Sequence, residues 1–268
     1  MHTFTVYVRL IHALVRSQLQ YRVSFLMDLI ATTFYTVLEF ASLVLILGRI
    51  KTLGSWTIPE ITLLYGLAEL SFGIMDMAFA GFDPSIFGAF IRQGSLDQLM
   101  LRPVSLTVQV MGSDFGLRRL GKCLLGLVIL LYGIWYAGII WTPEKALLLL
   151  LVLIGMVLFF AGLFMIGSTI TFWTVDSAEA MNILTYGGRA MIEYPMSIYQ
   201  NWLRKIFTFV VPVIFLNYYP VLHLLDKPDP FGFPAWSHWL SPVVGCGIFL
   251  LAILFWRFGL KHYQSTGT

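Results

Sequence analysis

Two glutamates, Glu39 and Glu69, stand near the middle of long apolar runs. A carboxylate at that depth in a hydrocarbon layer is costly, and it usually faces a bundle interior or an aqueous cavity. Three roles are open to such a residue. It can bind and release protons, line a polar path for a substrate, or hydrogen-bond between helices while burial keeps one carboxyl protonated. The residue types alone do not choose among these roles.

One stretch has the spacing of a phosphate-binding loop, because Gly116, Gly121 and Lys122 match Gly-x-x-x-x-Gly-Lys-Ser/Thr. However, Cys123 stands where the motif needs a hydroxyl for Mg²⁺, and the stretch opens an apolar run instead of following a buried strand. The five histidines lie in no metal-binding motif, and no Gly-x-Ser-x-Gly occurs. We therefore expect no catalytic, metal or cofactor site in this chain.

The composition is that of a membrane protein. Of the 268 residues, 58% are hydrophobic and 12% are charged, whereas a soluble domain carries about 25% charged residues. We expect an all-α, polytopic membrane protein that forms one transmembrane domain over residues 1–268 and binds lipid but no nucleic acid.

Six apolar runs are long enough to cross a hydrocarbon core, which needs roughly 20 residues each. They cover about 26–48, 61–81, 120–141, 146–173, 206–225 and 239–258. The segment 3–22 differs, because basic and polar residues recur on one helical face and apolar residues on the other. Such a helix lies in the headgroup plane of a membrane. We predict six transmembrane helices preceded by this interfacial helix.

The basic residues set the orientation, because inner loops carry an excess of Lys and Arg. If the N-terminus is inside, 13 of the 17 are inner: Arg9, Arg16, Arg22, Arg92, Arg102, Arg118, Arg119, Lys122, Arg189, Arg204, Lys205, Arg257 and Lys261. The other four are outer: Arg49, Lys51, Lys145 and Lys227. We expect a bacterial inner-membrane protein with both termini in the cytoplasm.

Two stretches between the spans are unusual. The stretch 176–205 is moderately polar, and we predict a second cytoplasmic segment there. The outer stretch 217–242 is rich in prolines and aromatic residues. It can form a re-entrant turn before the last span, or an ordinary loop whose tryptophans lie at the interface.

The predicted cytoplasmic loop 82–108 contains a short helix that ends before Pro103. Ser95 and Gln98 have capping-box spacing, and Asp97 lies in the first turn, where a negative charge suits the helix dipole. Leu96, Leu99 and Met100 share one face. So short a helix is unstable alone, so it must rest on the bilayer surface or on a partner protein.

The pattern Gly94-x-Leu96-Asp97-x-Leu99 followed by Arg102-Pro103 resembles the cytoplasmic loop of type-2 ABC exporter permeases. The resemblance is to the branch of about 260 residues with six spans. Three later segments, Glu193–Met196, Val211–Val213 and Tyr219–Pro220, are similar to the same branch.

The resemblance implies a membrane subunit of an ABC exporter that forms the substrate path. Two permease subunits, identical or paralogous, would pair, and each would dock on a separate cytosolic ATPase that binds ATP and Mg²⁺. Gly94, Leu96, Asp97, Leu99, Met100, Arg102 and Pro103 would form the coupling helix that contacts the ATPase. A proton-coupled secondary transporter that uses Glu39 and Glu69 remains the alternative.

Overall fold

The computed structural model describes residues 2–50, 52–174 and 178–263, and it confirms an all-α polytopic membrane protein. Within these ranges, four helices are long and apolar enough to cross a membrane, and a bent pair of helices brings the number to five. One further apolar helix, α7 (Leu120–Tyr136), is shorter.

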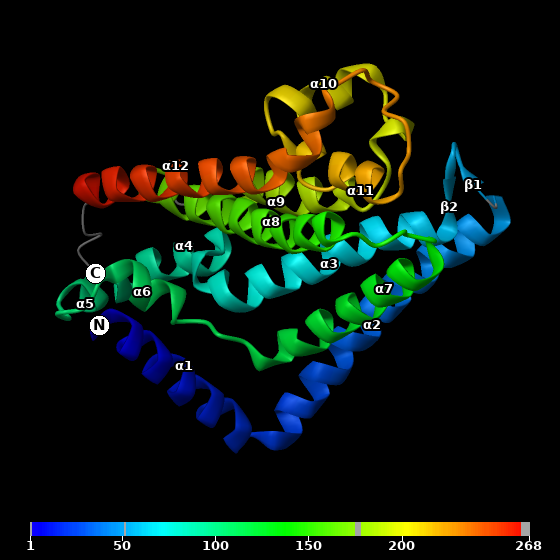
Figure 1. The fold of residues 1–268 in the computed structure, drawn as a ribbon. Helices are drawn as coiled ribbons and strands as arrows, with labels where there is room; N and C mark the ends of the chain where they lie inside the picture. The colour runs from blue at the N-terminus through cyan, green and yellow to red at the C-terminus, as the bar shows by residue number, and fades with distance from the viewer. Residues whose placement is uncertain (1, 51, 175–177, 264–268) are drawn as a thin grey trace.

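The long helices form layers around α3 (Figure 1). Helix α3 (Ile58–Phe79) packs on α7 on one side and on α8 (Pro143–Ile170) on the other, and α12 (Leu240–His262) packs on α8. Residues buried on every face of α3 make it the centre of the core. These helices cover most of the second, third, fourth and sixth predicted spans.

Glycines allow the layers to come close together. A Cβ atom added at Gly66 of α3 would lie 2.5 Å from the backbone nitrogen of Leu130 in α7. A Cβ atom at Gly245 of α12 would lie 2.1 Å from the carbonyl oxygen of Gly155 in α8. Small residues at such crossings let helix backbones touch, which is how helices commonly associate in membranes.

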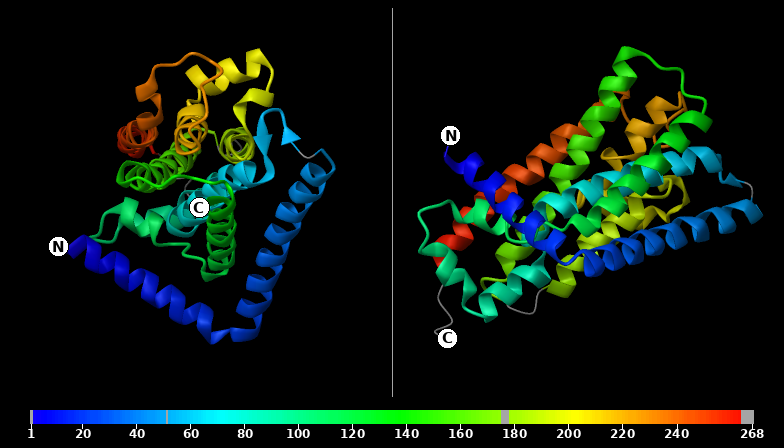
Figure 2. Two further views of the ribbon diagram at one scale, coloured as in Figure 1. Left: turned by 45° about the vertical axis from the view of Figure 1, so that its right-hand side comes forward. Right: turned by 90° about the horizontal axis from the view of Figure 1, so that it is seen from below.

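The two N-terminal helices form an open angle beside the bundle (Figure 2). Helix α1 (His2–Gln20) exposes Arg9, His12 and Arg16 and half-buries its apolar face. The Gln18 side chain fastens it, since Nε2 donates to the carbonyl of Phe115 (2.6 Å) and Oε1 accepts from the Leu117 N–H (2.9 Å). Helix α2 (Arg22–Ile50) runs back along α7, but the apolar window within it is only 11% buried.

A two-stranded hairpin, β1 (Thr52–Leu53) and β2 (Trp56–Thr57), joins α2 to α3 at the far end of the bundle. Gly54 at φ +63° permits its turn. Lys227 holds the hairpin, because its ammonium donates to the Ser55 carbonyl (2.7 Å) and pairs with Glu60 (2.6 Å).

Short helices connect the spans at both ends of the bundle. Toward the end where α1 begins and α12 ends, the chain forms η1 (Ala80–Phe82), α4 (Pro84–Arg92), α5 (Ser95–Met100), α6 (Leu106–Met111) and η2 (Leu117–Arg119). The chain between α8 and α12 forms α9 (Ala178–Ile192), η3 (Met196–Ile198), α10 (Asn201–Phe209), η4 (Val213–Phe215), α11 (Tyr218–Leu224) and η5 (Ala235–Trp239).

The predicted span over 206–225 is not one straight helix. Helix α10 ends at Phe209, and the segment beginning at Val213 turns away from it by 79°. Pro212 explains the break, because it has no N–H to donate and it forces Val211 out of the helical region. The bent pair forms either a broken span or a re-entrant loop.

The stretch 176–205 is not simply a loop, because α9 packs against α3, α4 and α8. The end of α9 is held in the core by Asn217. The Asn217 amide donates to the carbonyls of Leu64 in α3 (3.0 Å) and Ile192 in α9 (2.8 Å). Further along, the Arg204 guanidinium lies 4.2 Å from the ring centroid of Phe231. Arg204 therefore lies beside the segment predicted to be outer, so the inner placement of Arg204 and the outer placement of Phe231 cannot both hold.

Candidate functional site

Glu69 lies completely buried in the middle of α3, where its carboxylate meets two cations. Arg189 of α9 donates a very short hydrogen bond to Oε2. The Lys122 ammonium, from the first turn of α7, lies 4.0 Å from Oε1. A buried charge is tolerated only when it is paired in this way, so the pairing accounts for a glutamate at this depth.

Arg189 joins three carboxylates, one from α2, one from α3 and one from the turn that follows α9. Besides Glu69, it pairs with Glu193 one helical turn later (2.9 Å) and with Glu39 of α2 (3.5 Å). With Lys122, these residues form the ion cluster: Glu39, Glu69, Lys122, Arg189 and Glu193. Three carboxylates face two cations, so the fully ionised cluster carries one net negative charge.

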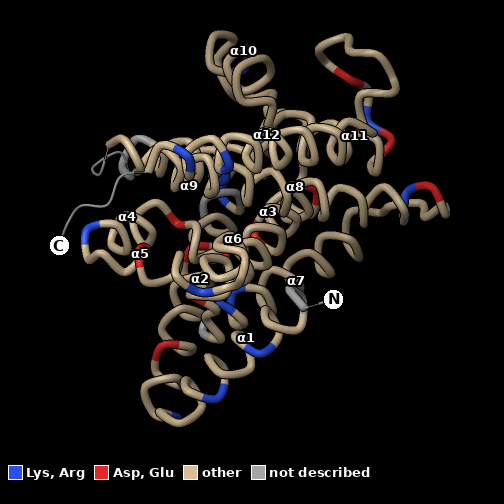
Figure 3. Tube along the Cα trace, turned by 90° about the vertical axis from the view of Figure 1, so that its left-hand side faces the viewer, with Lys and Arg blue, Asp and Glu red and all other residues tan. Residues whose placement is uncertain are grey.

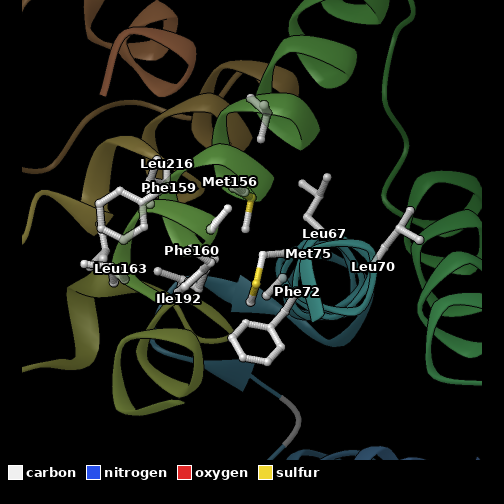
Figure 4. Close-up of a cluster of buried hydrophobic side chains, with 14 of the residues drawn as sticks. Leu67, Leu70, Phe72, Met75, Met156, Phe159, Phe160, Leu163, Ile192 and Leu216 are labelled. Carbon is white, nitrogen blue, oxygen red and sulfur yellow. The ribbon is translucent and has the colours of Figure 1, made fainter. Parts of the chain in front are cut away.

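An aromatic ring supports both cations of the ion cluster. The Lys122 ammonium lies 4.8 Å from the centroid of the Phe72 ring, and the Arg189 guanidinium carbon lies 5.3 Å from it. Phe72 in turn packs edge-on against Phe160 of α8, at 5.3 Å between centroids (Figure 4). Cation–π contacts in a desolvated site are worth about 2 kcal/mol, so the ring helps to fix both cations.

A second buried ion network lies one to two turns further along α3. Arg119 pairs with Asp76 (3.1 Å) and with Asp114 (3.2 Å), and the Arg119 side chain is 10% exposed. Figure 3 shows acidic and basic positions within the bundle as well as at its ends. Arg119 and Lys122 were counted among the inner basic residues, and both bury their side chains within the protein.

The ion cluster brings together the two glutamates singled out in the sequence, because both contact the same guanidinium. Sequence reasoning missed Arg189 and Glu193, although their i, i+4 spacing and the need of Glu69 for a cation were available signals. Within the cluster the accessible acid is Glu39, whose side chain is 34% exposed. The arrangement can hold the helices in register and present one carboxylate at the edge of α2.

Helix α5 is held against its own chain from two sides. The Gln109 amide donates to the carbonyls of Leu99 and Val104 (2.9 Å each). The Tyr263 hydroxyl, just beyond α12, donates to Asp97 (3.1 Å). The predicted capping box is wrong, because α5 begins at Ser95 after Gly94, whose left-handed conformation (φ +64°) replaces a side-chain cap.

The predicted apolar face of α5 divides in two. Leu96 is fully buried in the core and Leu99 is half-buried, while Met100 is 47% exposed. Leu101, just beyond the helix, is 86% exposed and is followed by exposed Arg102 and Pro103. Leu96 is therefore an anchor within this chain, and the surface open to a partner is 100–103.

A family model for ABC-2 family transporter proteins matches residues 33–267 of the chain. No curated protein and no solved structure matches it significantly. The match covers the long helices, the ion cluster and α5. This chain therefore belongs to the ABC-2 transporter family, and it is a membrane subunit of an ABC-type transporter.

Proposed function

We propose that this chain is the permease of an ABC exporter and that it couples to a separate cytosolic ATPase through the segment 100–103. The observation that carries the proposal is the division of α5: Leu96 is buried, whereas Met100 and Leu101 are exposed. Apolar anchors surrounded by polar residues supply most of the energy at protein interfaces. The exposed Arg102 can add charge complementarity with the partner.

The proposal also places the chain in a bacterial inner membrane with both termini cytoplasmic. Helix α1 begins and α12 ends near the end of the bundle that carries α5 (Figure 1), which supports a common cytoplasmic side for all three. A second permease subunit would pair with this chain. We expect the second subunit to pack on α2, because most of this helix is exposed and it carries apolar side chains such as Met27, Ile30 and Phe34. The substrate path would then pass Glu39, the partly exposed acid of the ion cluster.

Co-purification of the cognate ABC ATPase with permease variants tests the coupling. Leu101→Asp and Met100→Asp should reduce ATPase capture and transport at least tenfold, because the interface would have to bury an unpaired carboxylate. Ile140→Asp is the matched control, since Ile140 is 73% exposed and lies beyond α7, away from α5. Wild-type capture and transport in both variants would contradict the proposal.

A further inference from the structure

Three possible metal ligands meet near the hairpin end of the bundle, far apart in the sequence. Glu144 lies in the first turn of α8, His223 in α11 and His238 in η5. One ligand atom from each lies within 4.8 Å of the other two. The two imidazole rings are stacked, at 3.8 Å between centroids and 4° between planes.

His238 has a nitrogen that no protein group satisfies. Its Nε2 atom is buried and has no hydrogen-bond partner among the described residues. Buried polar atoms nearly always have a partner, so an unsatisfied imidazole nitrogen beside a second imidazole and a carboxylate points to a missing ligand. The ion pair between His223 and Glu144 (3.5 Å) does not involve His238, so it leaves the buried Nε2 atom of His238 without a partner.

A separate contact already fixes the helices that carry these ligands. The ammonium of Lys145, beside Glu144 in the chain, donates to the Leu224 carbonyl (3.1 Å) and pairs with Asp226 (2.7 Å). The start of α8 is therefore fastened to the end of α11. Both histidines also line a cavity of about 350 Å³, which leaves room for an ion and a water ligand.

We propose that Glu144, His223 and His238 form a binding site for a divalent transition metal, with Zn²⁺ the best match. Two imidazoles and one carboxylate are a common zinc donor set, whereas Ca²⁺ and Mg²⁺ prefer oxygen ligands. Tetrahedral zinc with bonds of about 2.0–2.1 Å would place the donors about 3.3 Å apart. Side-chain rotation of the exposed Glu144 and of the stacked rings closes the remaining gap.

The metal would join α8, α11 and the segment that leads into α12. A bound ion would thus immobilise the bent α10–α11 segment relative to two long helices. This site is separate from the ion cluster and from the segment 100–103, so it does not depend on the proposed coupling to an ATPase.

The test is zinc titration of the detergent-purified full-length chain, without a histidine tag and after chelator treatment. We expect one Zn²⁺ per chain in the wild type. His223→Gln and His238→Gln should each weaken the binding at least tenfold. His262→Gln is the matched control, because this exposed histidine lies at the other end of α12 and should leave binding unchanged.

A spectroscopic measurement on the wild type covers the case in which a variant does not fold. Co²⁺ in place of zinc should give the intense visible absorption of a tetrahedral centre, which excess Zn²⁺ should remove. Absence of equimolar zinc binding, or a Co²⁺ spectrum without tetrahedral bands, would overturn the site. So would a loss smaller than tenfold in either folded histidine variant.

Discussion

The hydroxyl of Tyr263 donates a hydrogen bond to Asp97, so the residue that follows α12 is joined to α5 across 166 positions of sequence. Burial and this bond raise the pKa of Tyr263 to about 12, so the hydroxyl keeps its proton at physiological pH. This bond is a direct link between α5 and the end of α12, and we expect it to carry movement from one to the other.

We expect Tyr263→Phe to lower the amount of transport per ATP hydrolysed while leaving ATPase capture intact. The change removes a hydrogen bond worth about 1 kcal/mol but keeps the ring that packs against Phe172 (5.4 Å). Reconstituted vesicles with measured ATP turnover and transport provide the ratio. Tyr21→Phe, at an exposed tyrosine between α1 and α2, is the control. An unchanged ratio in Tyr263→Phe would show that the bond does not contribute to coupling.

Arg189→Gln should destabilise the protein more than Glu69→Gln. The first variant leaves three buried or half-buried carboxylates with Lys122 alone, and loss of one partner of a buried pair costs about 3–5 kcal/mol. The second leaves Arg189 with two carboxylates but removes the carboxylate that faces Lys122, at a cost of about 1.5–3 kcal/mol. Unfolding in detergent measures both.

The double variant of Glu69 and Arg189 should lose less stability than the sum of the two single variants, because the residues share one contact. Arg257→Gln, at an exposed arginine of α12, should change stability by less than about 0.5 kcal/mol. Strict additivity of the two losses would mean that the pair is not energetically coupled.

Glu39→Gln should retain most of the transport activity. Glu39 lies at the exposed edge of the ion cluster, 3.5 Å from Arg189, and an amide can still accept a hydrogen bond from that guanidinium. A proton-coupled transporter needs a titrating group and would be inactivated by the change. Uptake assays with and without a pH gradient distinguish the two mechanisms. Loss of transport together with dependence on the gradient would favour proton coupling.

Gly66→Ala should lower the melting temperature because it forces α3 and α7 apart. The new Cβ would lie 2.5 Å from the Leu130 backbone nitrogen, and overpacking of this kind costs about 1–3 kcal/mol. Gly187→Ala is the matched control in α9, where no atom lies within 4 Å of the added Cβ. There alanine should stabilise the helix by up to about 1 kcal/mol. Equal effects in the two variants would contradict the close crossing.

Cysteine labelling tests the topology, in a background from which exposed Cys246 has been removed. An impermeant maleimide should label cysteines at Ser55 and Lys205 from outside intact cells, and should not label a cysteine at Gln98. We choose position Lys205 for labelling because its neighbour Arg204 packs on Phe231, and the segment of Phe231 leads back to Lys227, which contacts the hairpin at Ser55. Labelling at Gln98 but not at Ser55 would reverse the orientation.

The sequence predicted the long helices well where an apolar run was unbroken, as in α8 and α12. It failed at α9 because Arg189 and Glu193 make that segment polar. Only the folded protein shows that Arg189 pairs with Glu193, Glu69 and Glu39. At 206–225 it missed the bend, because the apolar composition concealed the breaking effect of Pro212.

The same limit applies to the sites. The loop helix near Gly94–Pro103 was recognisable from its breakers, yet periodicity could not show that Leu96 faces its own core while Met100 faces outward. The possible metal ligands Glu144, His223 and His238 come from three segments with no common motif. Their proximity depends on how α8, α11 and η5 pack.

The contact between Gly155 and Gly245 has a mechanical consequence. At this crossing the backbones of α8 and α12 are in direct contact, so no side chain lies between them there to take up relative movement. We expect the two helices to tilt together. If docking at the proposed segment 100–103 displaces Tyr263, which follows α12, then His238, which precedes α12, and Glu144, at the start of α8, should be displaced with it.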